Sequence, residues 1–290
     1  MFELYDMPLF RPPSEANSLI VQATIGCSHN KCTFCGMYKM KKFRVKPVEE
    51  VKRELEIFKK YYGDVRRLFL ADGNAMCMKT EDLVEIVRYA KKLFPSLERV
   101  STYATPMDLL EKSVDELRWL REEGLSLVYL GVESGDDEIL KEIRKGVDSR
   151  EMIEAGRKAI RAGMTLSITA ITGLGGKERS FDHAKNTARV LNEMKPHYTA
   201  FLTLMIVENT LLYLKLRRGE FTPLNHLEIL RELRWVIEDL RYRTVFRANH
   251  ASNYLPIRAN LPEDREEVLK LIDYAMEHPE ILRPEHLRGL

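Results

Sequence analysis

The sequence predicts an α/β protein built as a partial (β/α)6 barrel resembling a TIM barrel, and three observations support that class. Short runs of branched apolar residues alternate with longer amphipathic segments along most of the 290 residues. Six or seven such pairs occur, and strands joined by helical crossovers form a parallel sheet. No internal stretch rich in Gly, Pro or Ser divides the chain. We therefore expect one barrel domain, 18–242, with an N-terminal extension, 1–17, and a C-terminal strand and helix extension, 243–290, packed on the barrel.

The first half of the chain supplies four expected strands, each rich in branched or aromatic residues, at 18–25, 67–72, 99–105 and 125–133. Helices are expected between them at 47–62, 80–94 and 113–124, where apolar residues recur every three or four positions. Pro47 suits a first helical position, and Thr80 is a candidate N-cap. Ser113 and Glu116 form a capping box, and Gly124 ends that helix.

The second half continues the alternation with strands at 165–172, 198–207 and 244–250. Helices are expected at 136–145, 149–162, 180–194, 226–240 and 262–277. Gly146 and Gly163 follow two of these helices, as glycine does after a helix C-terminus.

Composition restricts the classes of function. A net charge of +2, with 44% hydrophobic and 31% charged residues, predicts a packed core and gives no electrostatic reason for binding membranes or nucleic acid. The start "MFELYDMPLFRPP" has no signal-peptide pattern, and no 18-residue apolar run occurs. We expect a cytoplasmic protein, in which clustered cysteines are metal ligands rather than disulfides. The single glutamine, Gln22, among many Lys, Arg and Glu residues favours a thermophile as the source.

Three of the four cysteines, Cys27, Cys32 and Cys35, lie within "GCSHNKCTFCG", directly after the first strand. Thiolates spaced C-x4-C-x2-C suit a soft metal or an iron–sulfur cluster. Three sites are possible: a [4Fe–4S] cluster with one open iron, a [2Fe–2S] cluster completed by Cys77, or a structural zinc with His29 or Cys77 as fourth ligand. Neither a ferredoxin module nor a zinc site explains the polar residues at the later strand ends, which favours the first.

Polar residues follow two of these later strands. In "ADGNAMC", Asp72 and Asn74 could accept from an ammonium group and Gly73 allows close approach, although the same residues are common in an ordinary turn. In "GVESGDDEIL", Glu133 and Ser134 could bind a diol, while the following Gly-Asp also suits a helix start.

Two further segments carry weaker signals. The glycine turn "TGLGG", 172–176, is open to close approach by a ligand. His250, within "RANHASNY", could act as an acid, a base or a hydrogen-bond donor, or could be a structural histidine.

This combination resembles the radical S-adenosylmethionine (SAM) superfamily. The cysteine loop with Phe34 before its last cysteine, "DGN" after the second strand and "GVESGDDEILKEIRKG" after the fourth carry the resemblance, which runs over 18–210. The last stretch is most similar to the branch that contains oxygen-independent coproporphyrinogen oxidases, methylthiotransferases and cobalamin-binding radical enzymes. Two departures are present: the first cysteine spacing is one residue longer than the usual C-x3-C, and Asn74 replaces the usual glutamate.

The resemblance implies a [4Fe–4S] cluster held by Cys27, Cys32 and Cys35, with SAM chelated at the open iron. It assigns contacts with SAM to Phe34, Asp72, Gly73, Asn74, Glu133, Ser134, Arg144, Lys145 and Gly173. Of these, Phe34 and the Gly173 turn would lie near adenine, and the turn at 72–74 would receive the ammonium group. Glu133 and Ser134 would meet the ribose or methionyl part, and Arg144 or Lys145 would pair with the carboxylate.

The chemistry implied by the resemblance is reductive cleavage of SAM to a 5′-deoxyadenosyl radical, which abstracts hydrogen from an unidentified substrate. The reaction needs a low-potential electron donor such as ferredoxin or flavodoxin. Cys77 could donate a hydrogen atom or a proton to a substrate radical, or could be a small buried residue. Only Cys77 is left for a second cluster, and no cobalamin domain fits before residue 18, which argues against those subclasses. The alternative function is a non-catalytic binder of a cluster, SAM or haem that acts as a chaperone or sensor.

Overall fold

The computed structural model describes residues 4–289, which divide into two compact units. The first unit comprises Met1–Asn30, Met37–Leu130 and Ala155–Leu166, and the second comprises Lys31–Gly36, Gly131–Glu154 and Ser167–Leu290. Strand β6 (Leu125–Glu133), helix α6 (Ser149–Arg161) and strand β7 (Thr165–Thr172) each have residues in both units.

The first unit contains parallel strands in the order β1-β4-β5-β6. Its other strands are β1 (Leu19–Gln22), β4 (Arg67–Ala71) and β5 (Arg99–Ala104). Leu19 pairs with Leu68, and Leu68 pairs with Val100. All four residues of β1 are buried, as expected for a parallel strand covered on both faces. A short antiparallel pair, β2 (Thr24–Ile25) and β3 (Arg44–Val45), follows β1 in the chain order.

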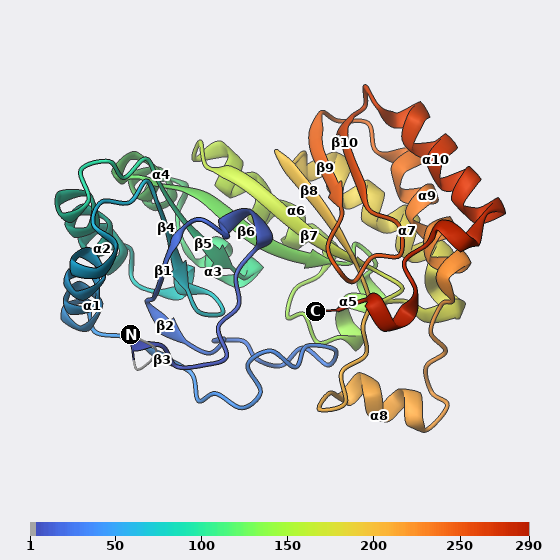
Figure 1. The fold of residues 1–290 in the computed structure, drawn as a ribbon, viewed down its shortest axis with the longest axis horizontal. Coiled ribbons are helices and arrows are strands. Elements are labelled where there is room, and N and C mark those ends of the chain that lie inside the picture. The colour runs from blue at the N-terminus through green and yellow to red at the C-terminus, as the bar shows by residue number, and fades with distance from the viewer. Residues whose placement is uncertain (1–3, 290) are drawn as a thin grey trace. The chain divides into compact units, whose positions relative to one another are not determined.

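Helices cover the strands of the first unit: α1 (Val48–Tyr62), α2 (Thr80–Leu93), α3 (Pro106–Glu111) and α4 (Val114–Glu123), with the 3-10 turns η2 (Pro13–Glu15) and η3 (Ala75–Cys77). Helix α1 packs beside α2, and α2 packs beside α4 (Figure 1). Val51, Leu55 and Phe58 form the buried stripe of α1. Their spacing of three to four residues keeps them on one side of the helix.

The N-terminal segment is part of the core of the first unit. Leu9 packs on a buried cluster that includes Phe69 and Tyr129, whose rings meet edge to face. Glu15 is fully buried and accepts hydrogen bonds from Arg99 Nη2 at 2.8 Å and from the Tyr129 hydroxyl at 2.5 Å. A buried carboxylate is tolerated only with such partners, so these contacts fix the segment on the strands.

The second unit contains parallel strands β7 (Thr165–Thr172), β8 (Tyr198–Thr203) and β9 (Thr244–Ala248). Strand β10 (Ile257–Leu261) is added antiparallel to β9, which gives the order β7-β8-β9-β10. Within this unit the side chains of β9 and β10 alternate between buried and more exposed, as in a sheet with one covered face.

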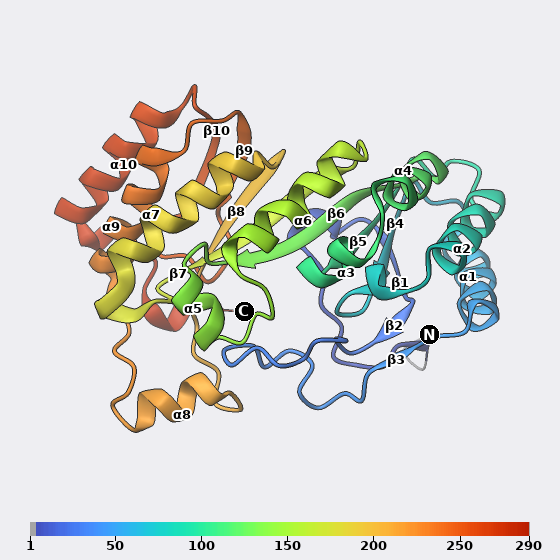
Figure 2. The ribbon, with the colours of Figure 1, turned by 180° about the vertical axis from the view of Figure 1, so that it is seen from behind.

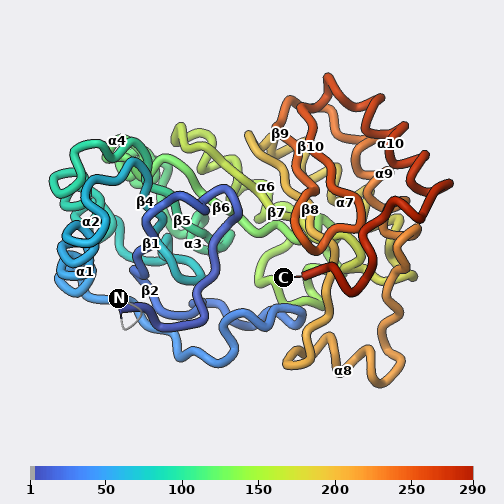
Figure 3. Tube along the Cα trace, viewed as in Figure 1, coloured from blue at the N-terminus to red at the C-terminus, as the bar shows by residue number. Residues whose placement is uncertain are grey.

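Helices of the second unit include α5 (Asp137–Glu142), α7 (Gly176–Met194), α8 (Leu211–Arg217), α9 (His226–Asp239) and α10 (Arg265–Glu277), with the turns η4 (Pro279–Ile281) and η5 (Glu285–Leu287). Helix α9 packs against α7 and against α10, and Figure 2 shows these three together from behind. After α10 the chain turns back (Figure 3), and Arg288 donates to the backbone carbonyl of Leu204 beyond β8.

The α/β class with a mostly parallel sheet is confirmed, and so are the eight helices expected from the sequence, with small shifts at their ends. The capping box of Ser113 and Glu116 is present. The N-cap prediction for Thr80 is wrong, because Thr80 is the first residue of α2 and its hydroxyl donates to Glu116 at 2.9 Å. Helices α3 and α8 and strands β3 and β10 were not expected. Within residues 4–289, no helix has the length and apolarity needed to cross a membrane.

Gly135 provides a test of packing in the second unit. A Cβ atom at this position would lie 2.3 Å from the Asn186 carbonyl oxygen and 2.7 Å from Thr187 Cα, both in α7. We expect Gly135→Ala to lower the free energy of unfolding by about 1–3 kcal/mol, because backbone must move to admit the methyl group. Urea unfolding followed by circular dichroism measures the change. Gly289→Ala, where a Cβ meets nothing within 4 Å, is the control, and equal stability of the two variants would contradict this account.

Candidate cluster and cofactor site

Cys27 is held by the turn that follows β4. The backbone N–H of Gly26 donates to Asp72 Oδ2 at 3.0 Å, and the N–H of Ser28 donates to Asn74 Oδ1 at 2.9 Å. Between them, the N–H of Gly73 donates to the Gly26 carbonyl at 3.0 Å. Residues 72–74 therefore bind the chain on both sides of Cys27, and we call this arrangement the Cys27 clamp.

The clamp requires glycine at its centre. A Cβ atom on Gly73 would lie 2.7 Å from Cys27 Cβ and 2.8 Å from Cys27 Cα. Real Cβ atoms essentially never come so close to another carbon, so any other residue here would displace Cys27. The close approach anticipated for Gly73 is thus an approach by the cysteine loop itself.

Asp72 is fully buried, and one of its two carboxylate oxygens accepts several hydrogen bonds. Oδ2 accepts from Lys41 Nζ at 2.8 Å, from Gly26 N–H and from Gln22 Nε2 at 3.3 Å. Oδ1 is buried and makes no hydrogen bond of good geometry among the described residues, although the Tyr38 hydroxyl interacts with this carboxylate. A buried carboxylate oxygen without a partner costs free energy, so this atom is suited to accept from a cationic ligand group.

A second buried oxygen without a hydrogen-bond partner among residues 4–289 belongs to the Tyr38 hydroxyl. Burial raises the pKa of Tyr38, and so do the negative charge of Asp72 and a side-chain hydrogen-bonding interaction with it. The hydroxyl therefore stays protonated at physiological pH and remains a donor. Lys41 lies over the Tyr38 ring, with Nζ 5.6 Å from its centroid.

Asn74 serves the clamp. Besides accepting from Ser28, it donates to the Ser28 hydroxyl at 2.7 Å and to both oxygens of Asp108, at 2.9 and 3.1 Å. Asp108 is buried at the start of α3, and burial raises its pKa. Of the two acceptors expected for an ammonium group, Asp72 and Asn74, Asp72 has the oxygen that is not yet bonded.

Cys77 ends the 3-10 turn after the clamp and is half-buried. Burial, reinforced by the charge of Asp108, raises the pKa of the Cys77 thiol to about 12. A protonated thiol is a poor metal ligand but can still give up a hydrogen atom. The role expected for Cys77 stays a prediction.

Cys32 and Cys35 belong to the second unit, in segment 31–36. The N–H of Thr33 donates to the Ile143 carbonyl after α5, and the Thr33 carbonyl accepts from the N–H of Leu212 in α8, both at 2.9 Å. Cys32, Phe34 and Cys35 are all half-buried. All four cysteines of the chain are described, and none of them forms a disulfide.

The end of β6 brings Glu133 next to Lys145. Glu133 Oε1 lies 3.0 Å from Lys145 Nζ, and both side chains are mostly buried. Arg144 is exposed. The structure thus pairs the two residues expected near the ligand's diol and carboxylate, and Lys145 is the more sheltered of the two basic candidates.

Ser134 lies in a buried polar network that the sequence did not predict. Its hydroxyl is 2.8 Å from His183 Nδ1 and accepts from the Asp136 N–H at 3.0 Å. His183 Nε2 is 3.6 Å from Glu232 Oε1. Glu232 accepts from the Gly173 N–H at 2.7 Å and from the Ser180 hydroxyl at 2.5 Å. The network therefore links the ends of β6 and β7 through α7 and α9.

A sequence signal for this network existed. His183 lies on the buried stripe of α7 with Ala184 and Thr187, and Glu232 lies between Ile229 and Leu233 on the buried stripe of α9. Titratable residues on core-facing stripes need buried partners. Asp136, in contrast, starts a helix, as the sequence also allowed. It is the N-cap of α5, and its Oδ2 lies 2.9 Å from Arg179 Nη2.

Gly173 also lines a cavity of about 320 Å³ within the second unit. Its other walls are mostly apolar side chains after β8 and in the region of α9, with Tyr254, Glu285 and Arg288 supplying the polar part. The φ of Gly173 is +85°, and a Cβ atom would lie 2.7 Å from Ile229 Cδ1. Both facts favour glycine at this strand end.

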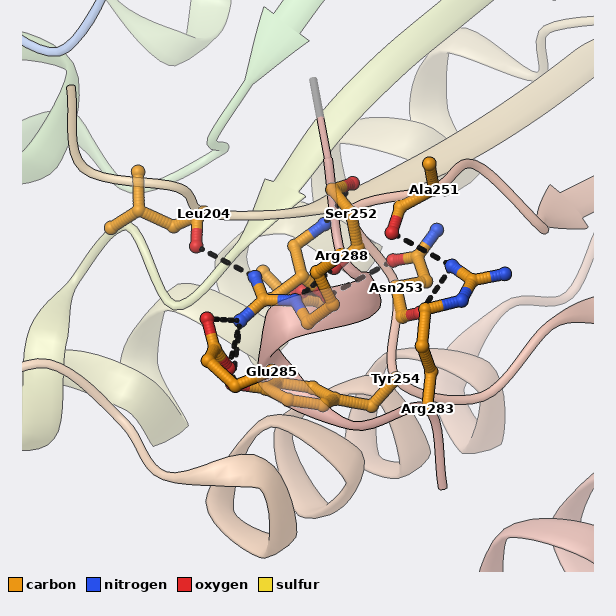
Figure 4. Close-up of polar contacts among 10 residues, drawn as sticks. Leu204, Ala251, Ser252, Asn253, Tyr254, Arg283, Glu285 and Arg288 are labelled. Carbon is orange, nitrogen blue, oxygen red and sulfur yellow. Dashed lines mark hydrogen bonds and ion pairs between the residues drawn. The ribbon is translucent and has the colours of Figure 1, made fainter. Parts of the chain in front are cut away.

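His250 lies beside the C-terminal cluster drawn in Figure 4. Its Nδ1 accepts from the N–H of Ser252 at 3.1 Å, and burial lowers its pKa, with a further contribution from Arg283. In the cluster, Arg283 donates to the carbonyls of Ala251 and Asn253, and Arg288 donates to that of Ser252 (Figure 4). His250 therefore helps shape the 250–254 loop, and its catalytic role stays a prediction.

Across residues 4–289, no three His, Cys, Asp or Glu side chains gather around a point where they could hold a metal ion. Each cysteine ligand of an iron–sulfur cluster binds its own iron, so three such ligands need not converge on one ion. The donor set itself, three closely spaced thiols, fits an iron–sulfur cluster.

The folds and sites described so far define an α/β protein with a cysteine loop held at the end of its first strand. Comparison with known families makes this specific. The sequence profile of the Radical SAM superfamily matches residues 21–191, more than half of the chain. The protein belongs to the radical SAM superfamily, as expected from the resemblance, and the family and its solved neighbours support SAM and a [4Fe–4S] cluster as the cofactors.

Curated relatives are distant. The heme chaperone HemW of Bacillus subtilis is 23% identical over 201 residues, which cover 67% of this chain and 52% of HemW. The putative methylthiotransferase MJ0865 of Methanocaldococcus jannaschii is 27% identical over 178 residues, covering 56% and 38%. The chain thus spans about half, or less, of the length of these two relatives.

Solved structures show the same fold. The cobalamin-dependent radical enzyme OxsB superposes with a TM-score of 0.60 at 15% identity, covering 90% of this chain and 46% of OxsB. Coproporphyrinogen III oxidase (HemN) from Escherichia coli gives 0.55 at 18% identity, covering 74% and 51%. Methylornithine synthase (PylB) gives 0.53 at 17% identity, covering 91% and 85%. These likenesses confirm the partial-barrel fold class.

The buried network predicts how stability depends on pH. Burial raises the pKa of Glu232, so the folded protein holds this proton at pH values where the unfolded chain has lost it. Unfolding free energy should therefore fall as pH rises above about 4.5, and Glu232→Gln should lack this contribution. Urea unfolding of both proteins between pH 4.5 and 7.5 tests it. The wild type should lose stability relative to the variant as pH rises, and identical pH profiles would contradict the assignment.

Proposed function

We propose that this protein is a radical SAM enzyme that cleaves SAM reductively at a [4Fe–4S] cluster. The bound cofactors would supply a 5′-deoxyadenosyl radical that abstracts hydrogen from a substrate not yet identified. The observation that carries the proposal is the Cys27 clamp, which fixes a cysteine of the loop beside a buried carboxylate oxygen without a partner among residues 4–289.

Cys27, Cys32 and Cys35 would hold the cluster. Three thiolates leave one iron of a four-iron cluster without a protein ligand, which is the position that SAM needs. Cys77 lies 42 residues beyond Cys35, outside the loop that supplies these three thiolates. Within the longer first spacing, Asn30 takes a left-handed φ of +38° and its side chain donates to the Tyr38 carbonyl at 3.0 Å.

Asp72 would accept from the ammonium group of SAM through Oδ1. Lys41 balances part of the carboxylate charge through Oδ2, and the pair holds the carboxylate in one orientation. Gly73 and Asn74 would act through Cys27 and its backbone neighbours. This assignment would account for the departure from the family's glutamate, because Asp72 would supply the negative charge.

In the second unit, Glu133 would bind the ribose diol and Lys145 or Arg144 the ligand's carboxylate. Ser134 would position this strand end through His183, since its hydroxyl is already bonded. The Gly173 turn and Phe34 would border adenine. Cys77 and His250 remain candidates for delivering a hydrogen atom or a proton, and the electron would come from a low-potential donor in the cytoplasm.

A second candidate function is that of a non-catalytic chaperone or sensor for haem or a cluster. The similarity to the heme chaperone HemW favours it. The two functions differ in turnover, because a chaperone need not consume SAM.

The test is SAM cleavage by anaerobically reconstituted protein reduced with dithionite. We expect about four irons and four sulfides per chain, no zinc, and 5′-deoxyadenosine as a product on chromatography. Cluster assembly without any such product, across varied reductants and candidate substrates, would favour the chaperone. Zinc in place of iron would exclude both.

Single cysteine variants serve as matched controls in the same experiment. Cys27→Ala, Cys32→Ala and Cys35→Ala should each lose the cluster absorbance and the product, because each removes one of three ligands. Cys77→Ala should keep the cluster absorbance. Loss of the cluster in Cys77→Ala would show four thiolate ligands and contradict the open iron.

A further inference from the structure

The segment directly after the cysteine loop, 37–46, carries five cationic residues and no carboxylate. Two of the cations are buried and form ion pairs. Lys41 Nζ lies 2.8 Å from Asp72 Oδ2, and Lys46 Nζ lies 2.6 Å from Glu54 Oε1. The other three, Lys39, Lys42 and Arg44, are exposed. The segment therefore presents three positive charges to solvent, while its two buried ion pairs hold it on the first unit.

These exposed charges are only partly neutralised. Arg44 pairs with Glu50 at 3.0 Å, whereas Lys39 donates to the uncharged backbone carbonyl of Asn30 at 2.7 Å. Lys42 forms no ion pair within residues 4–289. Lys39 and Lys42 thus carry positive charges that no carboxylate of the described chain offsets.

Apolar side chains lie among these charges around a groove of about 510 Å³. Met7, Ile25, Met40 and Phe43 line it together with Asp6, Lys41, Lys42 and Arg44. Asp6, the one carboxylate among these lining residues, lies 3.6 Å from Lys41 Nζ and so leaves Lys42 without an ion pair among the described residues. Met7 is 58% exposed and Met40 is 61% exposed, so both apolar side chains face solvent. Flexible, exposed methionines beside cations are typical of surfaces that bind other proteins. We call this surface the basic groove.

The basic groove is adjacent to the first proposed cluster ligand. Ile25, in its wall, is two residues before Cys27. A Cβ atom on the intervening Gly26 would lie 3.3 Å from Lys41 Cβ and 3.6 Å from Phe43 Cα. Ile25 in β2 also pairs with Arg44 in β3, so the backbone that leads to Cys27 and the backbone that forms the groove are directly paired within the first unit.

We propose that the basic groove is the docking surface for a small acidic electron-carrier protein of the flavodoxin type. This rests on the proposed function, which requires one electron per SAM cleaved. In the docked complex the reduced carrier is oxidised by one electron, and the cluster beside Cys27 is reduced by one electron from its 2+ to its 1+ state. No proton transfer or further reactant is needed.

Charge complementarity favours this occupant. Opposite charges across an interface accelerate encounter and fix orientation, while the central apolar side chains supply contact area. A nucleic acid would instead need a longer track of cations, because its affinity depends on the number of phosphates neutralised. The exposed cations here span only six residues, and Met7 and Met40 line the same groove.

The experiment compares the binding of an acidic flavodoxin to the wild type and to the double variant Lys39→Glu/Lys42→Glu. Oxidised flavodoxin is titrated calorimetrically at low salt, a readout that does not require SAM cleavage. We expect affinity to fall at least about tenfold in the variant, and the difference to shrink at about 0.5 M salt as charges are screened. Reduction of the cluster by reduced flavodoxin should slow in parallel, whereas reduction by dithionite should not change.

The matched control is Lys60→Glu/Lys92→Glu, which makes the same charge change at two exposed lysines near the C-terminal ends of α1 and α2. Lys60 lies twelve residues beyond the start of α1, roughly 18 Å along the helix. This control should bind flavodoxin as the wild type does. Equal affinity of wild type and Lys39→Glu/Lys42→Glu, or equal weakening in the control, would overturn the proposal.

Three further outcomes separate the possible failures. Cleavage of SAM with dithionite, but no charge-dependent binding of flavodoxin, would overturn the docking surface and leave the proposed function intact. Binding of a single-stranded RNA that depends on Lys39 and Lys42, in the absence of flavodoxin binding, would identify a nucleic-acid surface instead. Failure of SAM cleavage with intact, charge-dependent flavodoxin binding would count against the proposed function alone.

Discussion

The Cys27 clamp is the contact on which the rest of the site depends. Asp72 and Asn74 bind the backbone on either side of Cys27, and Gly73 leaves no space between the two segments. Each clamp residue follows β4, so the position of the cysteine is set by the pairing of β1 with β4. The clamp also explains why an acid and an amide are both present. The acid keeps a free oxygen, and the amide connects the loop to Asp108.

Buried polar groups organise both units, and each is held by several partners. Glu15 fixes the N-terminal segment in the first unit, and Glu232 fixes the Gly173 turn in the second. Such groups are costly to bury, and their partners must remain in place for the fold to be stable. The same principle singles out Asp72, because its second oxygen and the neighbouring Tyr38 hydroxyl make no hydrogen bond of good geometry among the described residues. This is the arrangement expected where a ligand supplies the missing contact.

Much of the fold could be predicted from the sequence, because helices and parallel strands leave periodic patterns. The strand ends also made Asp72 and Glu133 predicted site residues, since chain order alone brings such residues to the sites of barrel enzymes. The roles of Asn74 and Ser134 could not be predicted, because their partners Asp108 and His183 lie 34 and 49 residues away. Short elements such as α8 and β10 were missed for a related reason. Their stability comes from tertiary packing, which leaves little local periodicity.

The central claim is that three cysteines leave one iron open for SAM beside Asp72. The most direct measurement is electron nuclear double resonance on the reduced, reconstituted protein with SAM labelled with ¹⁵N at its amino nitrogen. The account predicts a hyperfine coupling between the cluster and ¹⁵N, together with a change in the electron paramagnetic resonance spectrum when SAM is added. A cluster whose spectrum is unchanged by SAM and shows no ¹⁵N coupling would contradict it.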